Sequence, residues 1–219
     1  MLRLALVAFA AFAFVAPARA EVPESLREQV LRGDDRAALA ALRSLDLTPE
    51  RRYLRARLLE RLGEQAAAVE DYAGDLPELV RDSASKRRAH LLAVLGRCAE
   101  ALPLLSERGR QPRADRAECL ARTARSEEEK QAARAAIRRT LAARRTDTYE
   151  LRELLAQITP DEAGAIRREA MLQHPTHHSV DLSAIEWTAE ERLRLGETLL
   201  AARHPERALP LMRGTPPDN

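Results

Sequence analysis

Three histidines lie within five residues of one another, after a stretch with helical periodicity. His174, His177 and His178, together with Asp181, offer nitrogen and oxygen atoms of the kind that bind zinc. Their spacing matches no closed tetrahedral pattern, and a useful site also needs ordered partners behind its ligands. We therefore expect a solvated loop here, with neither a metal nor another cofactor.

The same loop contains the residue types of a hydrolase triad. His178 and Ser179 are adjacent and Asp181 follows closely, but triad members are brought together by a fold, and neighbouring side chains point apart. The chain also lacks a phosphate loop, a dinucleotide fingerprint, a nucleophile elbow and a His-Glu-x-x-His motif. The sequence therefore predicts a protein without catalysis of its own.

A basic cluster on one long predicted helix could contact an anionic polymer. It consists of Arg134, Arg138, Arg139, Arg144 and Arg145. Arginine is the usual cation of this chain, since lysine occurs only at positions 86 and 130, and a run of charge is usually the solvated face of an amphipathic helix. We therefore expect these arginines to form the solvated face of that helix.

Residues 1–20 have the features of a secretory signal peptide. Arg3 precedes an apolar run, which Pro17 ends, and small residues lead to Ala20. The run is shorter than the roughly 20 residues that a membrane span needs. We expect cleavage after Ala20, a periplasmic location, and no membrane span in the mature chain, residues 21–219.

The charge balance of the mature chain argues against nucleic-acid binding. The full sequence has 36 basic and 34 acidic residues, and two arginines but no acid lie in residues 1–20, so 34 of each sign remain. Phosphate binding requires net local positive charge.

All three phenylalanines also lie in residues 1–20, so the mature core must consist of Leu, Ala, Val and Ile, which suits closely packed helices.

Four leucine-rich stretches end in the same pattern: a turn residue, four further positions, then alanine and an aliphatic residue. The copies run from Gly33 to Ala38, from Gly63 to Ala68, from Gly96 to Ala101 and, in degenerate form, from Arg203 to Ala208. The step of 33 residues between the second and third glycines is the length of one helix-turn-helix unit, which buries its apolar face only by stacking on neighbours. The pattern predicts an all-α superhelix of about 11–12 short antiparallel helices.

Capping signals place the helix starts. Thr159 with Glu162, Ser126 with Glu129 and Thr188 with Glu191 form predicted capping boxes, and Thr48-Pro49 opens another helix. The longest expected loop is 174–185. The predicted helices span residues 24–32, 35–44, 49–62, 64–73, 84–95, 97–107, 113–124, 127–143, 147–157, 160–173, 188–202 and 205–212.

At these positions the residues resemble tetratricopeptide-type repeats. Small residues stand seven positions before three of the turn residues, and leucines stand four before them. The small residues are Ala56, Ala89 and Gly196, and the leucines are Leu59, Leu92 and Leu199. Ala163, Ala170 and Pro175 match the second helix of such a unit and its terminating proline. The resemblance implies a solenoid that binds protein or peptide partners.

A narrower resemblance is to the N-terminal superhelical region of soluble lytic murein transglycosylases. The segment from Thr188 to Leu209 is similar to segments of that region, which follows a signal peptide. The lysozyme-like catalytic domain of the family, in which a glutamate is usually followed by serine, has no match in this sequence. Glu24-Ser25 has the same dipeptide but none of its surrounding motif. The resemblance implies a cell-wall scaffold that binds peptidoglycan or a partner enzyme. The alternative is an independent periplasmic adaptor for peptides.

Only two cysteines occur, and in an exported repeat protein they are candidates for a disulfide. Cys98 would open the second helix of one unit and Cys119 would fall in the first helix of the next, and these elements stack in such repeats. The alternative is a pair of small buried side chains that pack as modest hydrophobes.

Overall fold

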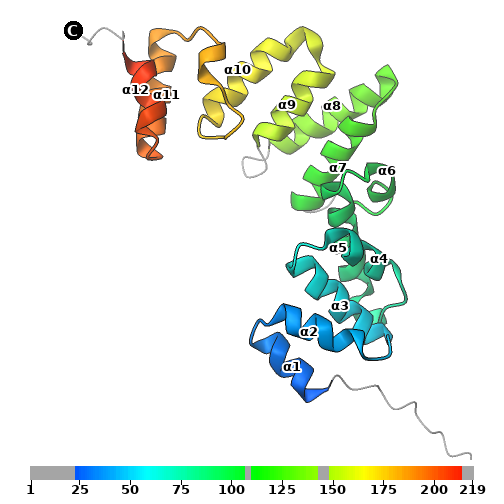
Figure 1. Ribbon diagram of the computed structural model, residues 1–219. Coiled ribbons are helices and arrows are strands. Elements are labelled where there is room, and N and C mark those ends of the chain that lie inside the picture. Colours follow the sequence, from blue (N-terminus) through cyan, green and yellow to red (C-terminus); the bar gives the residue numbers. More distant parts are fainter. Residues whose placement is uncertain (1–22, 107–109, 143–147, 214–219) are drawn as a thin grey trace, which may run out of the picture.

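The computed structural model of the protein describes residues 23–106, 110–142 and 148–213 and is all-α (Figure 1). Over these ranges the chain forms twelve α-helices and two short 3₁₀ helices, with no strand. The predicted signal peptide and the tail 214–219 lie outside the described residues. None of the described helices combines the length and apolar character that crossing a membrane requires.

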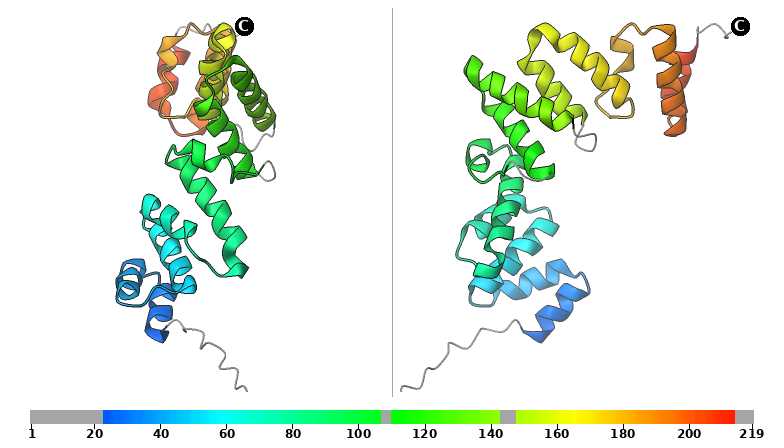
Figure 2. Two further views of the ribbon diagram at one scale, coloured as in Figure 1. Left: turned by 90° about the vertical axis from the view of Figure 1, so that its right-hand side faces the viewer. Right: turned by 180° about the vertical axis from the view of Figure 1, so that it is seen from behind.

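The helices follow one another with short connections. Their bounds are α1 Glu24–Leu31, α2 Asp35–Arg43, α3 Pro49–Arg61, α4 Gln65–Ala73, α5 Glu78–Val94, α6 Cys98–Ala101, α7 Arg110–Thr123, α8 Glu127–Leu141, α9 Tyr149–Ile158, η1 Pro160–Glu162, α10 Ala163–Gln173, η2 Leu182–Ala184, α11 Ala189–Ala201 and α12 Pro205–Met212. Each α-helix packs mainly against its neighbours in the chain, and α7 also contacts α5 and α9. The result is an elongated, bent array in which α8–α12 turn away from the arm formed by α1–α7 (Figures 1 and 2).

The four turn residues all adopt the same left-handed conformation. Gly33, Gly63 and Gly96 have φ angles of 77°, 80° and 74°, and Arg203 has a φ of 63°. In each copy, the turn residue's N–H bonds to the carbonyl three residues back, and the next N–H bonds to the carbonyl five residues back. Glycine adopts this conformation without the steric cost that a Cβ brings, so three of the four copies end their helix with the residue that fits best.

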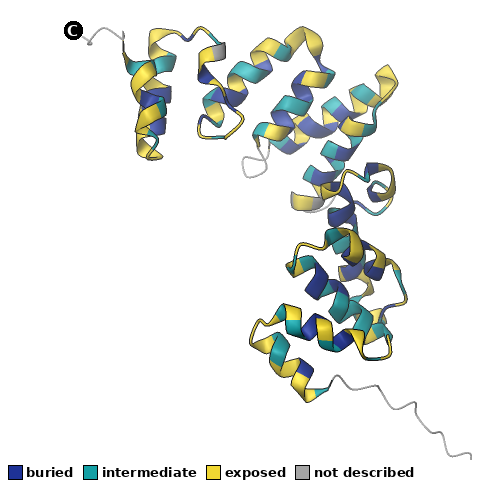
Figure 3. Ribbon diagram, in the orientation of Figure 1, coloured by how far each residue is buried: buried dark blue, intermediate teal, exposed yellow. Residues whose placement is uncertain are grey.

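Alanines close the interfaces between successive helices. Ala38, Ala68, Ala101 and Ala208 are fully buried, and the small residues seven positions before the turns are buried as well. A Cβ on Gly196 would lie 2.6 Å from Cγ of Met212, so an alanine at this position would require the Met212 side chain to shift. The buried side chains form three successive hydrophobic clusters along the array, while the outer faces are exposed (Figure 3).

Ion pairs join successive helix pairs at a nearly constant sequence distance. Arg61 lies 2.6 Å from Asp35, Arg87 lies 2.9 Å from Glu60, and Arg97 lies 3.1 Å from Glu70. The partners are 26 or 27 residues apart in the chain. The charged residues thus bridge neighbouring units at the edges of the apolar core.

Two predicted helices differ from those observed by more than four residues at one end. The helix expected over 84–95 begins at Glu78, directly after Pro77. The helix expected over 97–107 is only the single turn α6, because Pro103 has no N–H for another helical bond and its ring clashes with the preceding turn.

The predicted cap at Thr159 is wrong. Ser126 and Thr188 form the expected capping boxes, and Thr48 accepts a hydrogen bond from the N–H of Arg51. Thr159 makes no such bond, because the chain after it first forms the 3₁₀ turn η1 and only then α10.

Candidate functional site

The histidine loop is held by contacts to the start of α9. Nε2 of His177 lies 2.7 Å from a carboxylate oxygen of Glu150, and its ring stacks on Tyr149 with centroids 4.6 Å apart. The ring of His178 tilts against that of His177. Within the described ranges, no group of three or more His, Cys, Asp or Glu side chains is placed to hold a metal ion.

The triad-like residues of this loop are directed to other partners. The N–H of Ser179 donates to Nδ1 of His177, at 3.3 Å. The Asp181 carboxylate accepts bonds from the backbone and hydroxyl of Ser183, which lower the pKa of Asp181. The loop therefore folds on itself and on α9.

The predicted basic cluster is divided among different surfaces. Arg134 donates to the carbonyl of Ile158 at 2.8 Å and pairs with Glu127, and Arg138 lies 3.0 Å from Glu162. These two arginines fasten α8 to the end of α9 and to η1. Arg139 lines a groove elsewhere on α8, and Arg144 and Arg145 lie outside the described residues.

That groove, of about 590 Å³, runs between α7 and α8. Its described lining consists of three arginines, four alanines and one leucine, a formal charge of +3. They are Arg113, Arg116, Ala117, Leu120, Ala132, Ala135, Ala136 and Arg139. On each helix the lining residues stand at positions i, i+3, i+4 and i+7, which lie on one helical face.

The basic side chains gather at one end of this groove. The short connection 124–126 returns the chain, so α8 runs antiparallel to α7. Arg113 near the start of α7 therefore lies at the same end as Arg139 near the end of α8. Leu120 and Ala132 lie toward the other end, so the groove passes from a basic end to an apolar one.

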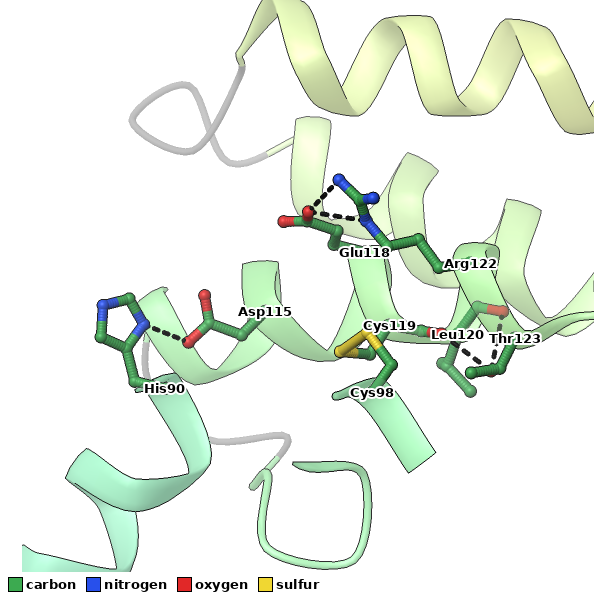
Figure 4. Close-up of a disulfide and its surroundings, with 8 residues drawn as sticks. All are labelled: His90, Cys98, Asp115, Glu118, Cys119, Leu120, Arg122 and Thr123. Atoms are coloured by element: carbon green, nitrogen blue, oxygen red, sulfur yellow. Dashed lines mark hydrogen bonds and ion pairs between the residues drawn. A yellow bond between two sulfur atoms is a disulfide. The ribbon is translucent and has the colours of Figure 1, made fainter. Parts of the chain in front are cut away.

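A second pocket, of about 500 Å³, lies between α5 and α7 and contains a buried aspartate. Asp115 Oδ2 lies 2.8 Å from Nδ1 of His90 (Figure 4). The other carboxylate oxygen, Oδ1, accepts a 2.7 Å bond from the side-chain amide of Gln111. The hydrogen bond to Asp115 raises the pKa of His90, against the opposing effect of burial. Both carboxylate oxygens are thus already engaged by protein groups.

Glu60, which also lines this second pocket, likewise has protein partners. Glu60 accepts a 2.7 Å bond from the hydroxyl of Tyr72 and a 2.9 Å bond from Arg87. Burial, together with the hydrogen bond to Glu60, raises the pKa of Tyr72 well above its usual range. These groups act mainly on one another and join α3, α4 and α5.

A third pocket, of about 640 Å³, lies at the end of the array between η2, α11 and α12. Arg192, Arg207 and Arg213 line it together with Asp181 and Glu186. Arg207 also donates to the carbonyl of Val180, at 2.8 Å. Of these three cavities, only the α7–α8 groove has a charged lining of a single sign.

The neighbours of α7 and α8 hold the groove's walls in place. Cys98 and Cys119 form a disulfide with their Cα atoms 4.9 Å apart, which joins α6 to α7 (Figure 4). On the other side, Arg134 and Arg138 fasten α8.

Of the remaining predicted packing residues, Ala170 is fully buried and Ala163 is partly buried against the middle cluster.

The arginines near the start of α7 are not among the residues predicted from the sequence. Arg113, Arg116, Ala117 and Leu120 follow the spacing of a single helical face, so the signal was present in the sequence. Whether this face lines a groove depends on which face of α8 packs beside it, and this is a property of the fold.

Comparison with models of protein families finds none that matches this chain, and a search of curated proteins finds no match either.

Proposed function

We propose that the protein is an exported, non-catalytic helical scaffold of the cell envelope, similar to the superhelical region of a lytic transglycosylase. On this proposal, it presents a preformed surface to peptidoglycan or to a protein partner. The observation that carries the proposal is the open α7–α8 groove, whose described charged residues are all basic and lie at the bend of the array. Such a surface binds through complementary charge and shape.

The fixed walls of the groove favour binding energetically. Association costs free energy whenever loops and side chains must become ordered. Here the disulfide Cys98–Cys119 holds α7, and the contacts of Arg134 to Ile158 and of Arg138 to Glu162 hold α8. A partner therefore meets a surface that is already in place, which reduces the ordering cost.

An independent peptide-binding adaptor is the second candidate. The alanines on the floor of the groove favour it, because small side chains leave room for the side chains of an incoming segment. The two candidates differ in whether the mature chain is retained on the cell wall, either directly or through a catalytic domain that it binds.

Co-sedimentation of purified residues 21–219 with isolated sacculi distinguishes the candidates. The scaffold proposal predicts either direct binding to sacculi or retention there through an added catalytic domain, whereas an independent adaptor shows neither. Soluble muropeptides should not be released, because glycosidic cleavage requires an acid at a raised pKa in an enclosing cleft. Release that disappears when one glutamate is replaced would overturn both candidates.

Export is tested on the protein recovered from a periplasmic extract. N-terminal sequencing should begin at Glu21, the residue after the proposed cleavage site. A protein that retains Met1 and stays in the cytoplasm would contradict the proposed location.

A further inference from the structure

We infer that the α7–α8 groove binds an amphipathic helix of a partner protein that carries carboxylates at one end. This inference rests on the proposed scaffold function and adds the chemical class of the partner. It is carried by three features of the groove: the state of its arginines, its floor, and its backbone.

The arginines at the basic end retain their capacity to bind a ligand. Within the described residues, neither Arg113 nor Arg139 makes a hydrogen bond or an ion pair, and both side chains are exposed. Arg134 and Arg138, on the same helix as Arg139, are by contrast paired with Glu127 and Glu162. Two guanidinium groups at one end of the groove therefore favour a ligand with two or more carboxylates.

The floor of the groove suits apolar side chains of moderate size. Ala132 and Ala135 are exposed on it, and Ala117 and Ala136 are buried below. A row of methyl groups offers apolar contact but no hydrogen bonds to the hydroxyl groups of a glycan. Leucine or methionine side chains at helical spacing fit such a surface, as in other helix-in-groove complexes.

The backbone around the groove favours a helical occupant over an extended one. Both walls are α-helices, whose interior N–H and C=O groups bond within the helix. An extended peptide would find no strand edge and would leave its own backbone groups unpaired against the alanine floor. A helix satisfies its backbone internally, so its side chains alone need to match the groove.

The matching ligand therefore has acidic residues in its first turns and an apolar stripe along one face. Acidic residues at the start of a helix also interact favourably with the helix dipole. We would use a fluorescein-labelled synthetic helix of this design, with leucines at i, i+3, i+4 and i+7 and glutamates in its N-terminal turns. A second peptide with lysine in place of every glutamate is the charge control.

Fluorescence anisotropy with the mature chain tests the inference. The acidic helix should bind and the lysine peptide should not. The double variant Arg113→Glu/Arg139→Glu should weaken binding about tenfold or more, since each change replaces an attraction with a repulsion. Higher salt should also weaken binding, because these charges are exposed.

Matched variants separate the groove from general charge. Arg36 and Arg43 on α2 are exposed and, among the described residues, likewise have no partner, so Arg36→Glu/Arg43→Glu makes the same change of net charge far from the groove. It should leave binding unchanged. Ala135→Tyr fills the floor without changing charge and should weaken binding, while Ala40→Tyr on α2 should not. Circular dichroism confirms that each variant is folded.

Three outcomes would overturn the inference. One is an affinity of the acidic helix weaker than roughly 1 mM. Another is equal weakening by the α2 and groove charge variants. The third is loss of sacculus binding in the Arg113→Glu/Arg139→Glu variant without any peptide binding, which would assign the groove to the wall polymer. Sacculus binding that survives while the peptide fails to bind would refute this inference and leave the scaffold proposal intact.

Discussion

Removing the disulfide should destabilise the middle of the array by a predictable amount. The double variant Cys98→Ala/Cys119→Ala opens a covalent link between residues 21 apart in the sequence. The chain-entropy account of such a link gives about 3 kcal/mol for a loop of this length. Both cysteines are buried, so the lost sulfur contacts add on the order of 1 kcal/mol. The sum is a large fraction of the 5–15 kcal/mol that is typical of total stability.

The loss should be concentrated at α6. This helix has a single turn, Cys98–Ala101, and a helix of that length does not persist without tertiary contacts. Urea unfolding followed by circular dichroism should show a lower midpoint in the variant. Hydrogen exchange should show weaker protection over residues 98–105, with α1–α3 unchanged. Reduced wild-type protein is the control and should behave like the variant.

Two results would refute this reasoning. One is the alkylation of two free thiols in exported protein that has never been reduced. The other is an unfolding midpoint in the variant equal to that of the oxidised wild type. Either result would mean that Cys98 and Cys119 act only as small buried side chains, the alternative that the sequence left open.

Three further predictions concern packing, turns and pH. Ala101→Glu places a carboxylate at a fully buried position and should cost several kcal/mol, and an unchanged melting temperature would contradict the helix packing described for α6. Gly63→Ala should lower stability by about 1 kcal/mol, because a Cβ is disfavoured at a φ of 80°, whereas Arg203→Gly should raise it; urea midpoints that move in the same direction would count against this account of the turns. Asp115 raises the pKa of His90 above its ordinary value of 6.5 in the folded state, so the imidazolium contributes its full stability below that value and loses it as pH rises through the folded-state pKa. The urea midpoint should therefore fall more between about pH 5.5 and about pH 8.5 in wild type than in His90→Gln, and equal slopes would show that the contact is not linked to folding.

Features of the fold that depend on a few adjacent residues were predictable. The caps at Ser126 and Thr188 and the turn at Arg203 arise from hydrogen bonds within five residues, so the sequence contains the relevant information. The length of α6 was mispredicted because leucines around Pro103 continue the apolar pattern while the proline ends the helix. The end of α6 is therefore set by the missing N–H and the ring of Pro103, although the apolar pattern continues beyond it.

The groove could not be predicted to the same extent. Arg138 and Arg139 are adjacent, yet one pairs with Glu162 and the other lines the groove, because one residue turns the side chain by about 100° around the helix. Which direction faces solvent depends on how α8 lies against α7 and α9. Likewise, the pairing of His90 with Asp115 depends on the way α5 meets α7, which no local pattern specifies.

The ion pairs 26 or 27 residues apart have a consequence for the order in which the chain acquires its structure. Each helix packs mainly against helices that are close to it in the sequence, so the contact order is low and folding should be fast. A chain that emerges N-terminus first can complete α1–α4 before α11 has appeared. If it is threaded through a membrane pore, each completed unit becomes too wide to slide back, so folding itself would favour forward passage.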